Sequence, residues 1–536
     1  MKTSGSAFEG LLGRYFEQLL ADNPVFATML AGLREAEGKL GSASARFHEK
    51  RERARQRVLR DLEAVSPHEL ASEQHLDRLA LRSLVLRETE DHARGRHAIE
   101  PNAPEQVLNI LVHELQRGDD EPRRAAANLR SLLRQVPAFL GEAADVVKTP
   151  ERVWLGIMEQ AVAGAPALLD SVQAFFQTAG PLPADQALVA GAKKAIALYG
   201  NRVRNLPLAP AGSFAIGPEV LQRRVRDELG LDYTLGQLET LALSEAARIG
   251  QSLQRTCASI GRGRSPGELL AQLRSQWRPA KPLLQLYQDE TRRVAKAFAA
   301  AKAVTFPVGD ELVVKPVPEF LRATIATAAY NPPGAFDKKQ RGVFWVKEID
   351  PATVGSSEAL AEEQQHFGVP LTCAHEAYPG HHLQFVTANR HPRKWRRLFA
   401  HAVFYEGWTL WCEQMTIDLG IERGPWAQLQ QLHDALWRCH RILVDIRLQT
   451  GRYTAAQAAR HLRKYLGFTP GRSEAEVNWY TTQPAVPMSY WLGRLENDRL
   501  RRRLVEGRGW TLRRFNDWLL SFGTIPQGWI EKYGLD

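Results

Sequence analysis

The chain has 536 residues, of which 44% are hydrophobic, so it is long enough to bury a large core. Lysine and arginine exceed aspartate and glutamate by only 70 to 60, and the basic residues are spread along the chain. Because nucleic-acid binding needs a concentrated basic surface or a known module, this composition argues against a nucleic-acid partner.

The four cysteines show no C-x-x-C spacing, which favours reduced thiols in a cytoplasmic protein. The N-terminal segment interrupts its apolar residues with Glu9, Arg14 and Glu17, so we expect no signal peptide. No run of about 18 apolar residues occurs, and we therefore expect neither a membrane span nor a membrane partner.

Most of the chain repeats its apolar residues with a period near 3.6, which is typical of amphipathic helices. FEGLLGRYFEQLL (8–20) and LGQLETLALSEAARIGQSLQ (235–254) are two examples. The breaks between such segments are short and rich in proline and glycine, and no repeat or low-complexity linker occurs. The sequence therefore predicts a mainly α fold in one compact unit.

Two stretches depart from the helical period. VTFPVGDELVVKPVP (304–318) and GVFWVKEID (342–350) are rich in β-branched and aromatic residues and are flanked by turn signals. They predict a small sheet next to the histidine-rich segment that follows. An edge strand there could pair with an extended peptide, although a purely structural hairpin is an equal alternative.

The segment HEAYPGHH, which begins at His375, is similar to the zinc motif H-E-x-x-H with its second histidine displaced. On an unbroken helix His381 lies about 9 Å along the axis from His375, and His382 about 10.5 Å, whereas two zinc-bound imidazole nitrogens lie within about 4 Å of each other. Pro379 cannot donate a backbone hydrogen bond and Gly380 adds freedom, so the helix can break between the histidines. The spacing predicts an expanded metal site in which the second ligand is His381 or His382.

A catalytic zinc ion usually has three protein ligands and a water molecule. The segment FYEGWTLWCEQM supplies Glu406 on the next predicted helix. Glu413 follows after about 700° of helical rotation, hence on nearly the same face, where it could hold the free N–H of a ligand histidine. Glu376 would then be the general base that activates the water.

These motifs resemble the domain-of-unknown-function 885 family of metallopeptidase-like proteins, whose hallmark is H-E-x-Y-P-G-H-H followed by E-G-W-x-x-Y-x-E. The chain has HEAYPGHH (375–382) and EGWTLWCE (406–413), and the resemblance extends to YNPPGAFDKKQRGVFWV (330–346). It implies a mainly helical, metallopeptidase-like fold with a gluzincin-like metal site. It also implies that His381 is the second histidine ligand and that Glu406 is the third ligand.

The chain departs from the family pattern at three positions. Arg447 and Gln449 stand where the family usually has glycine and histidine, and Trp479 stands where it often has arginine. We expect these positions to lie near the cleft, so they weaken any transfer of the family's substrate preference to this chain.

Together these observations predict a zinc-dependent hydrolase, with one Zn²⁺ per chain, that cleaves peptide or peptide-like amide bonds in short substrates. His375, His381 and Glu406 would hold the zinc, and Tyr490 in the segment PMSYWLG would donate a hydrogen bond to the oxyanion. The alternative is a non-catalytic, metal-bound binding protein derived from such an enzyme. The intact Glu376 argues against that alternative, since a structural zinc needs no general base.

The helical region, residues 1–300, is expected to form one wall of a deep cleft, and residues 301–536 to form the metal-binding catalytic region. Such a cleft would exclude folded proteins and admit a short peptide or an amide-containing small molecule. Arg341, Arg438 and Arg441 are predicted to bind the substrate, because a guanidinium pairs with a carboxylate through two parallel hydrogen bonds.

Overall fold

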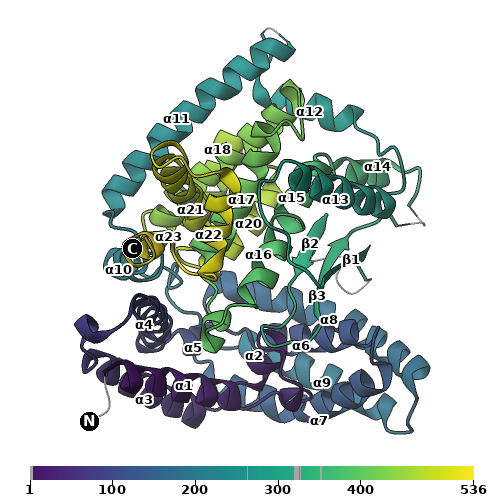
Figure 1. Cartoon of the computed structure of the whole chain (residues 1–536). Coiled ribbons are helices and arrows are strands. Elements are labelled where there is room, and N and C mark those ends of the chain that lie inside the picture. The colour runs from purple at the N-terminus through teal and green to yellow at the C-terminus, as the bar shows by residue number, and fades with distance from the viewer. Residues whose placement is uncertain (1–3, 262, 319–324, 326, 351–352, 536) are drawn as a thin grey trace. The chain divides into compact units, whose positions relative to one another are not determined.

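The computed structural model describes residues 4–261, 263–318, 325, 327–350 and 353–535. It is mainly helical with one three-stranded sheet, which confirms the predicted fold class (Figure 1). The chain forms two compact units, one of residues 1–215 with 334–337 and the other of residues 216–333 with 338–536.

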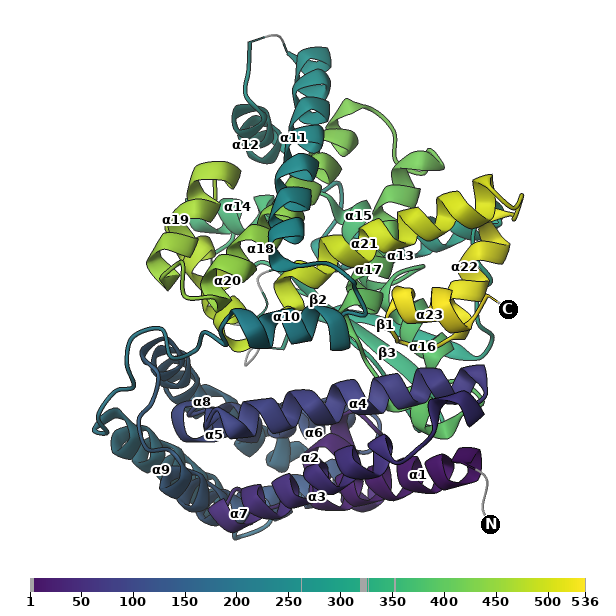
Figure 2. The same ribbon diagram turned by 90° about the vertical axis from the view of Figure 1, so that its left-hand side faces the viewer.

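The first unit is built of helices joined by short turns. They are α1 (Ser4–Asp22), α2 (Pro24–Met29), α3 (Ala45–Glu63), α4 (Ser72–Ala93), α5 (Arg96–Ile99), α6 (Ala103–Arg117), α7 (Pro122–Val146), α8 (Arg152–Ala179) and α9 (Asp185–Arg204), with 3-10 turns η1 (Arg34–Ala36) and η2 (Pro67–Glu69). Figure 2 shows α1, α3 and α4 running alongside one another. In α7 the buried residues Leu129, Leu132, Leu133 and Val136 follow the helical period, so one face of the helix packs into the core.

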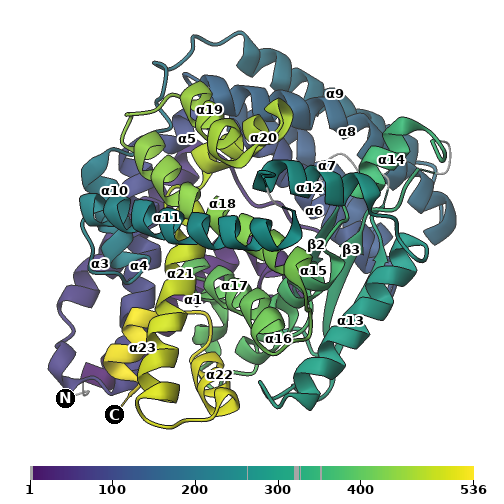
Figure 3. The ribbon, with the colours of Figure 1, turned by 90° about the horizontal axis from the view of Figure 1, so that it is seen from above.

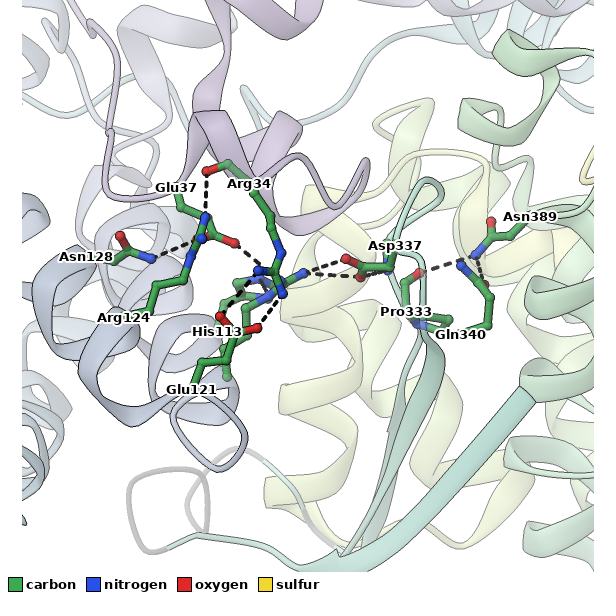
Figure 4. Close-up of polar contacts among 12 residues, drawn as sticks. Arg34, Glu37, His113, Glu121, Arg124, Asn128, Pro333, Asp337, Gln340 and Asn389 are labelled. Atoms are coloured by element: carbon green, nitrogen blue, oxygen red, sulfur yellow. Dashed lines mark hydrogen bonds and ion pairs between the residues drawn. The ribbon is translucent and has the colours of Figure 1, made fainter. Parts of the chain in front are cut away.

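A short segment from much later in the chain, residues 334–337, belongs to this first unit. Asp337 accepts two hydrogen bonds of 3.1 Å from the Arg117 guanidinium (Figure 4). A Cβ atom on Gly334 would lie 2.5 Å from the Cα atom of Gly32, so the two chain segments touch where neither has a side chain. The NPPG part of the motif at 330–346 therefore has a structural role.

The second unit contains the remaining helices and the sheet. Its helices are α10 (Pro218–Asp227), α11 (Leu235–Ile260), α12 (Pro266–Gln276), α13 (Leu283–Ala300), α14 (Ser357–Gln364), α15 (Val369–Glu376), α16 (His381–Ala388), α17 (Ala402–Asp418), α18 (Pro425–Gln449), α19 (Ala455–Leu466), α20 (Pro470–Thr482), α21 (Val486–Arg501), α22 (Leu512–Ser521) and α23 (Gln527–Tyr533). Helix α11 packs along α18, and α17 packs along α21 (Figure 3). Among the described residues, no helix is both long enough and apolar enough to cross a membrane.

The sheet has the order β1-β3-β2, with β1 (Asp310–Pro316), β2 (Ala328–Asn331) and β3 (Gln340–Val346). Strand β1 lies within the first predicted stretch, 304–318, and β3 overlaps the second, 342–350, but begins and ends earlier in the chain. They pair with each other in parallel and not as a hairpin. Strand β2, antiparallel to β3, was not predicted.

Helices α17 and α21 approach each other most closely at two glycines. A Cβ atom on Gly493 would lie 1.9 Å from the carbonyl oxygen of Val403, and one on Gly407 would lie 2.5 Å from the carbonyl carbon of Gly493. Since α17 carries Glu406 and α21 carries Tyr490, this backbone contact sets the distance between two elements of the candidate site.

We therefore predict that Gly493→Ala lowers the free energy of unfolding by about 1–3 kcal/mol or more, because the added methyl group forces the helices apart. Gly250→Ala on α11 is the matched control, since no atom lies within 4 Å of the position that its methyl group would occupy. That control should raise the stability by about 0.5–1 kcal/mol through helix propensity. Chemical denaturation of both variants measures the difference, and equal effects would contradict the predicted close contact.

Candidate metal centre

The helix that carries the histidine motif is broken where the spacing predicted. Helix α15 ends at Glu376 and α16 begins at His381. A Cβ atom on Gly380 would lie 1.8 Å from the carbonyl oxygen of His375, so only glycine allows the chain to fold back this tightly. The indole N–H of Trp408 donates a 2.8 Å hydrogen bond to the carbonyl of Pro379 and holds the break in place.

The break brings the predicted metal ligands together. Glu406 Oε2 lies 3.6 Å from His375 Nε2 and 3.7 Å from His381 Nε2. The two imidazole rings are 4.9 Å apart and nearly perpendicular, at 83°. Among the described residues, these three side chains form a group whose ligand atoms all lie within 4.8 Å of one another.

The chemistry of this group fits a divalent cation such as zinc. Ligand atoms at 2.0–2.2 Å from a tetrahedral zinc ion lie about 3.4 Å from one another, close to the distances observed here. Glu406 Oε2 is buried and has no hydrogen-bond partner among the described residues, although it faces both imidazoles. A cation would satisfy this acceptor, as a buried carboxylate requires.

Glu413 orients the first histidine. Its Oε1 atom lies 2.7 Å from Nδ1 of His375, which leaves Nε2 of that ring facing Glu406. Burial disfavours the charged form of His375, but the carboxylates of Glu406, Glu413 and Glu376 outweigh burial and raise the pKa of His375 to about 10. The carboxylates thus favour a positive charge at this position, whether a proton or a metal ion supplies it.

Glu376 lies at the end of α15, beside the three candidate ligands. Burial raises the pKa of Glu376 to about 7, and the charges of Glu406 and Glu413 act in the same direction, while those of His375 and Arg438 oppose it. A carboxyl group with a pKa near neutrality can both accept and return a proton, which suits a general base.

His382 is fully buried and uses both ring nitrogens elsewhere. Its Nδ1 lies 2.9 Å from the Tyr330 hydroxyl on β2, and its Nε2 lies 3.1 Å from Asp310 Oδ2 on β1. The Tyr378 hydroxyl donates a 2.6 Å hydrogen bond to the same Asp310 oxygen. A Cβ atom on Gly342 of β3 would lie 2.5 Å from His382 Nδ1, so the sheet leaves space for this ring. His382 therefore fastens α16 to the sheet and has no free nitrogen for a metal.

Tyr490 lies beside the same carboxylate as the histidines. Burial raises the pKa of Tyr490 well above its usual value, and the nearby Glu406 acts in the same direction, so the hydroxyl keeps its proton. The guanidinium of Arg441 lies 4.4 Å from its ring, and the Trp479 ring meets it edge-on at 6.4 Å. Trp479, a departure from the family pattern, is thus close to the candidate site.

The three predicted substrate-binding arginines differ in their contacts. Arg341 on β3 pairs at 2.9 Å with Glu311, its register partner on β1. Arg441 donates hydrogen bonds to the Tyr480 hydroxyl at 3.0 Å and to Glu476 at 3.1 Å. Arg438 differs from both, because its Nε and Nη1 atoms have no hydrogen-bond partner among the described residues. Its positive charge lowers the pKa of Glu376.

The other two departures from the family pattern are tied to neighbouring helices. Arg447 pairs with Glu239 of α11 at 2.9 Å and donates to the Tyr453 hydroxyl at 2.9 Å. The Gln449 side chain donates to the carbonyl of Tyr480 at 2.9 Å. These contacts connect the end of α18 to α11 and α20, and none of them involves the three candidate metal ligands.

Sequence reasoning missed the residues that support the break, namely Asp310, Tyr330 and Trp408. Each lies far from His375 in the sequence, and their contacts form only when the sheet and α17 pack against α15 and α16. Tyr378 carried a weak signal, since it lies inside the histidine motif itself.

The chain belongs to a family described as bacterial protein of unknown function (DUF885), whose profile matches residues 24–532. Among curated proteins, none matches this sequence. Two solved structures share the fold at a TM-score of 0.77: a candidate lipoprotein of unknown function from Shewanella oneidensis, and one from Colwellia psychrerythraea. The Shewanella protein is 18% identical to this chain, and the alignment covers 99% of this chain and 100% of the relative. The Colwellia protein is 17% identical, and the alignment covers 99% of both chains. Metallocarboxypeptidase 1 from Trypanosoma cruzi aligns with 99% of this chain and 91% of its own. Its TM-score of 0.39 and identity of 11% are too low to indicate a shared fold.

The comparison contradicts the predicted cytoplasmic location, because both fold relatives are described as candidate lipoproteins, a class of proteins that carry an attached lipid. The argument from cysteine usage fails for a physical reason. All four cysteines are free and buried. Thiols enclosed in a core are shielded from solvent oxidants and disulfide partners, so they do not report the redox state of the compartment.

We predict that His381→Ala raises the metal dissociation constant by at least about 100-fold, whereas His382→Ala has a much smaller effect. The reason is that His381 faces Glu406, while His382 is bonded to Tyr330 and Asp310. His382→Ala should instead lower the stability by about 1–3 kcal/mol, because buried polar groups lose their partner. Elemental analysis and competition with a chelating dye measure the affinities, and the reverse order would assign the second ligand to His382.

Proposed function

We propose that this protein is a zinc-dependent hydrolase that cleaves peptide or peptide-like amide bonds in short substrates. One observation carries the proposal. Two imidazole nitrogens and a buried carboxylate oxygen without a hydrogen-bond partner converge within 4.8 Å, and the carboxyl group of Glu376 lies beside them. A structural metal site would have no use for that carboxyl group.

His375, His381 and Glu406 would hold the ion. Bound zinc supplies Lewis acidity, which makes a water molecule easier to deprotonate and a carbonyl group easier to attack. Glu413 keeps Nδ1 of His375 engaged, so that Nε2 points at the ion.

The proton transfers fall to Glu376. It takes a proton from the attacking water and gives it to the amine that leaves when the C–N bond breaks, so it returns to its starting state after each turnover. The Tyr490 hydroxyl, which retains its proton, donates a hydrogen bond to the oxygen of the scissile carbonyl as negative charge develops there.

We predict that Glu376→Gln keeps the metal and lowers kcat by about 100- to 10,000-fold, because the amide cannot accept the proton. Glu219→Gln, at an exposed position on α10, is the matched control and should behave as wild type. Hydrolysis of a mixed library of short peptides, with metal content measured on the same samples, tests both variants. Activity that survives chelation, or a Glu376→Gln variant with wild-type turnover, would rule out this mechanism.

We further predict that Tyr490→Phe lowers kcat by about 10- to 1,000-fold with little change in KM or metal content. The change removes only the hydroxyl and keeps the ring on which Arg441 lies. An unchanged kcat would show that Tyr490 does not stabilise the oxyanion. Loss of metal would instead show that the Tyr490 hydroxyl mainly supports the metal ligand Glu406, whose pKa it lowers.

A further inference from the structure

Helix α18 presents four charged side chains on one face: Asp434, Arg438, Arg441 and Asp445. At 100° per residue their directions fall within about 60° of one another, so they form a single stripe along the helix. The two arginines in the middle of the stripe are 9% and 4% exposed. Buried guanidinium groups are costly unless they are paired, so the partners of each one matter.

Trp437 holds both guanidinium groups in place. The guanidinium carbon of Arg438 lies 3.8 Å from the centre of the Trp437 ring, and that of Arg441 lies 4.2 Å from it. Stacking on an aromatic face orients a planar guanidinium and reduces the entropy that it loses when it binds an anion.

The two arginines differ in what their N–H groups contact. Arg441 donates through Nε to Tyr480 and through Nη2 to Glu476, which leaves only its Nη1 without a hydrogen-bond partner among the described residues. In Arg438, Nε and Nη1 are both buried and have no hydrogen-bond partner among the described residues. Asp434 is 3.9 Å from Nη1 of Arg438, which is too long for a hydrogen bond.

Arg438 lies in a group of side chains that extends to the candidate metal centre. Its guanidinium shares the Trp437 ring with that of Arg441, and the Arg441 guanidinium carbon lies 4.4 Å from the ring of Tyr490, the proposed oxyanion donor. Helices α17 and α21, which carry Glu406 and Tyr490, both pack against α18. The unpaired N–H groups of Arg438 thus belong to the same cluster of side chains as Tyr490.

We propose that Arg438 binds a carboxylate group of the substrate, so that the protein acts on short peptides or amides that carry a free acid close to the scissile bond. This inference rests on the proposed hydrolase function. A carboxylate can accept two parallel hydrogen bonds from one guanidinium, which would satisfy Nε and a terminal nitrogen together. The acid could be the C-terminal carboxylate of a peptide or an acidic side chain.

Arg494 on α21 provides a matched control. It is 4% exposed, pairs with Asp498 one turn along its helix and lies 4.9 Å from the Trp411 ring. Its Nη1 contacts Asp498, and its Nε is buried without a hydrogen-bond partner among the described residues, but it lies on the Trp411 ring and not on the Trp437 ring that Arg438 shares with Arg441. A buried arginine is therefore not by itself evidence of a carboxylate-binding site. Arg438 is distinguished by its place in the cluster of side chains that includes Tyr490.

The test compares zinc-loaded wild-type protein with Arg438→Gln, Arg438→Lys and Arg494→Gln. Three N-acetylated tripeptides are used: one with a free C-terminus, the same peptide amidated, and an amidated peptide that ends in glutamate. We expect wild type to favour at least one acidic peptide over its neutral amide by about 10- to 100-fold in kcat/KM. Arg438→Gln should reduce that ratio to within about threefold through a higher KM, Arg438→Lys should retain part of it, and Arg494→Gln should keep the wild-type ratio.

The two acidic peptides identify the source of the carboxylate. Preference for the free C-terminus indicates exopeptidase action, and preference for the glutamate peptide indicates recognition of a side chain. An equal rate on acidic and neutral peptides, or an unchanged ratio in Arg438→Gln, would overturn the proposal while leaving the hydrolase function intact.

If wild type cleaves none of the peptides, calorimetric binding of the same three peptides to the full-length Glu376→Gln protein decides the question. Weaker binding of the acidic peptides to the Glu376→Gln, Arg438→Gln double variant would support Arg438 as the carboxylate-binding residue, even though the proposed hydrolysis had failed. Equal binding with and without that change would overturn it.

Discussion

The contact between Gly380 and the carbonyl oxygen of His375 is the constraint on which the metal centre depends. A regular helix would separate His375 and His381 by about 9 Å along its axis. The absence of a side chain at Gly380 lets the chain fold back at this point, and the two imidazole rings lie 4.9 Å apart instead. The distances from both histidines to Glu406 follow from that local turn.

Two carboxylate–histidine pairs then give the turn its chemistry. Glu413 engages Nδ1 of His375 and leaves Nε2 facing the candidate ion. Asp310 engages Nε2 of His382 and, with Tyr330 at the other nitrogen, fastens α16 to the sheet. The same type of contact therefore orients a ligand on one side of the break and anchors the backbone on the other. The small sheet matters because it supplies Asp310 and Tyr330, whether or not it also binds a peptide.

Local sequence signals were enough for the parts that depend on neighbours along the chain. The helical period predicted the mainly α fold, Pro379 and Gly380 predicted the break, and the spacing of Glu406 and Glu413 placed both on one face of α17. Features that depend on distant contacts were not predicted. Strand β2 has a short sequence without a clear pattern, and it is defined by its pairing with β3. Likewise, residues 334–337 have the composition of an ordinary loop, yet Asp337 is bonded to Arg117 of the first unit.

The same limit applies to the arginines, which are equivalent in the sequence. Their roles separate only when the acids around them are known: Glu311 pairs with Arg341, Glu476 pairs with Arg441, and Arg438 keeps unbonded N–H groups. The charge balance of the site gives that difference a consequence. Glu376, Glu406 and Glu413 surround the candidate ion with carboxylates, which attract a cation but repel an acidic substrate. A fixed positive charge close by would add to that of the ion and offset the repulsion of a substrate's free acid. Arg438, held on the Trp437 ring, supplies such a charge without being neutralised by a hydrogen-bonded acid of its own.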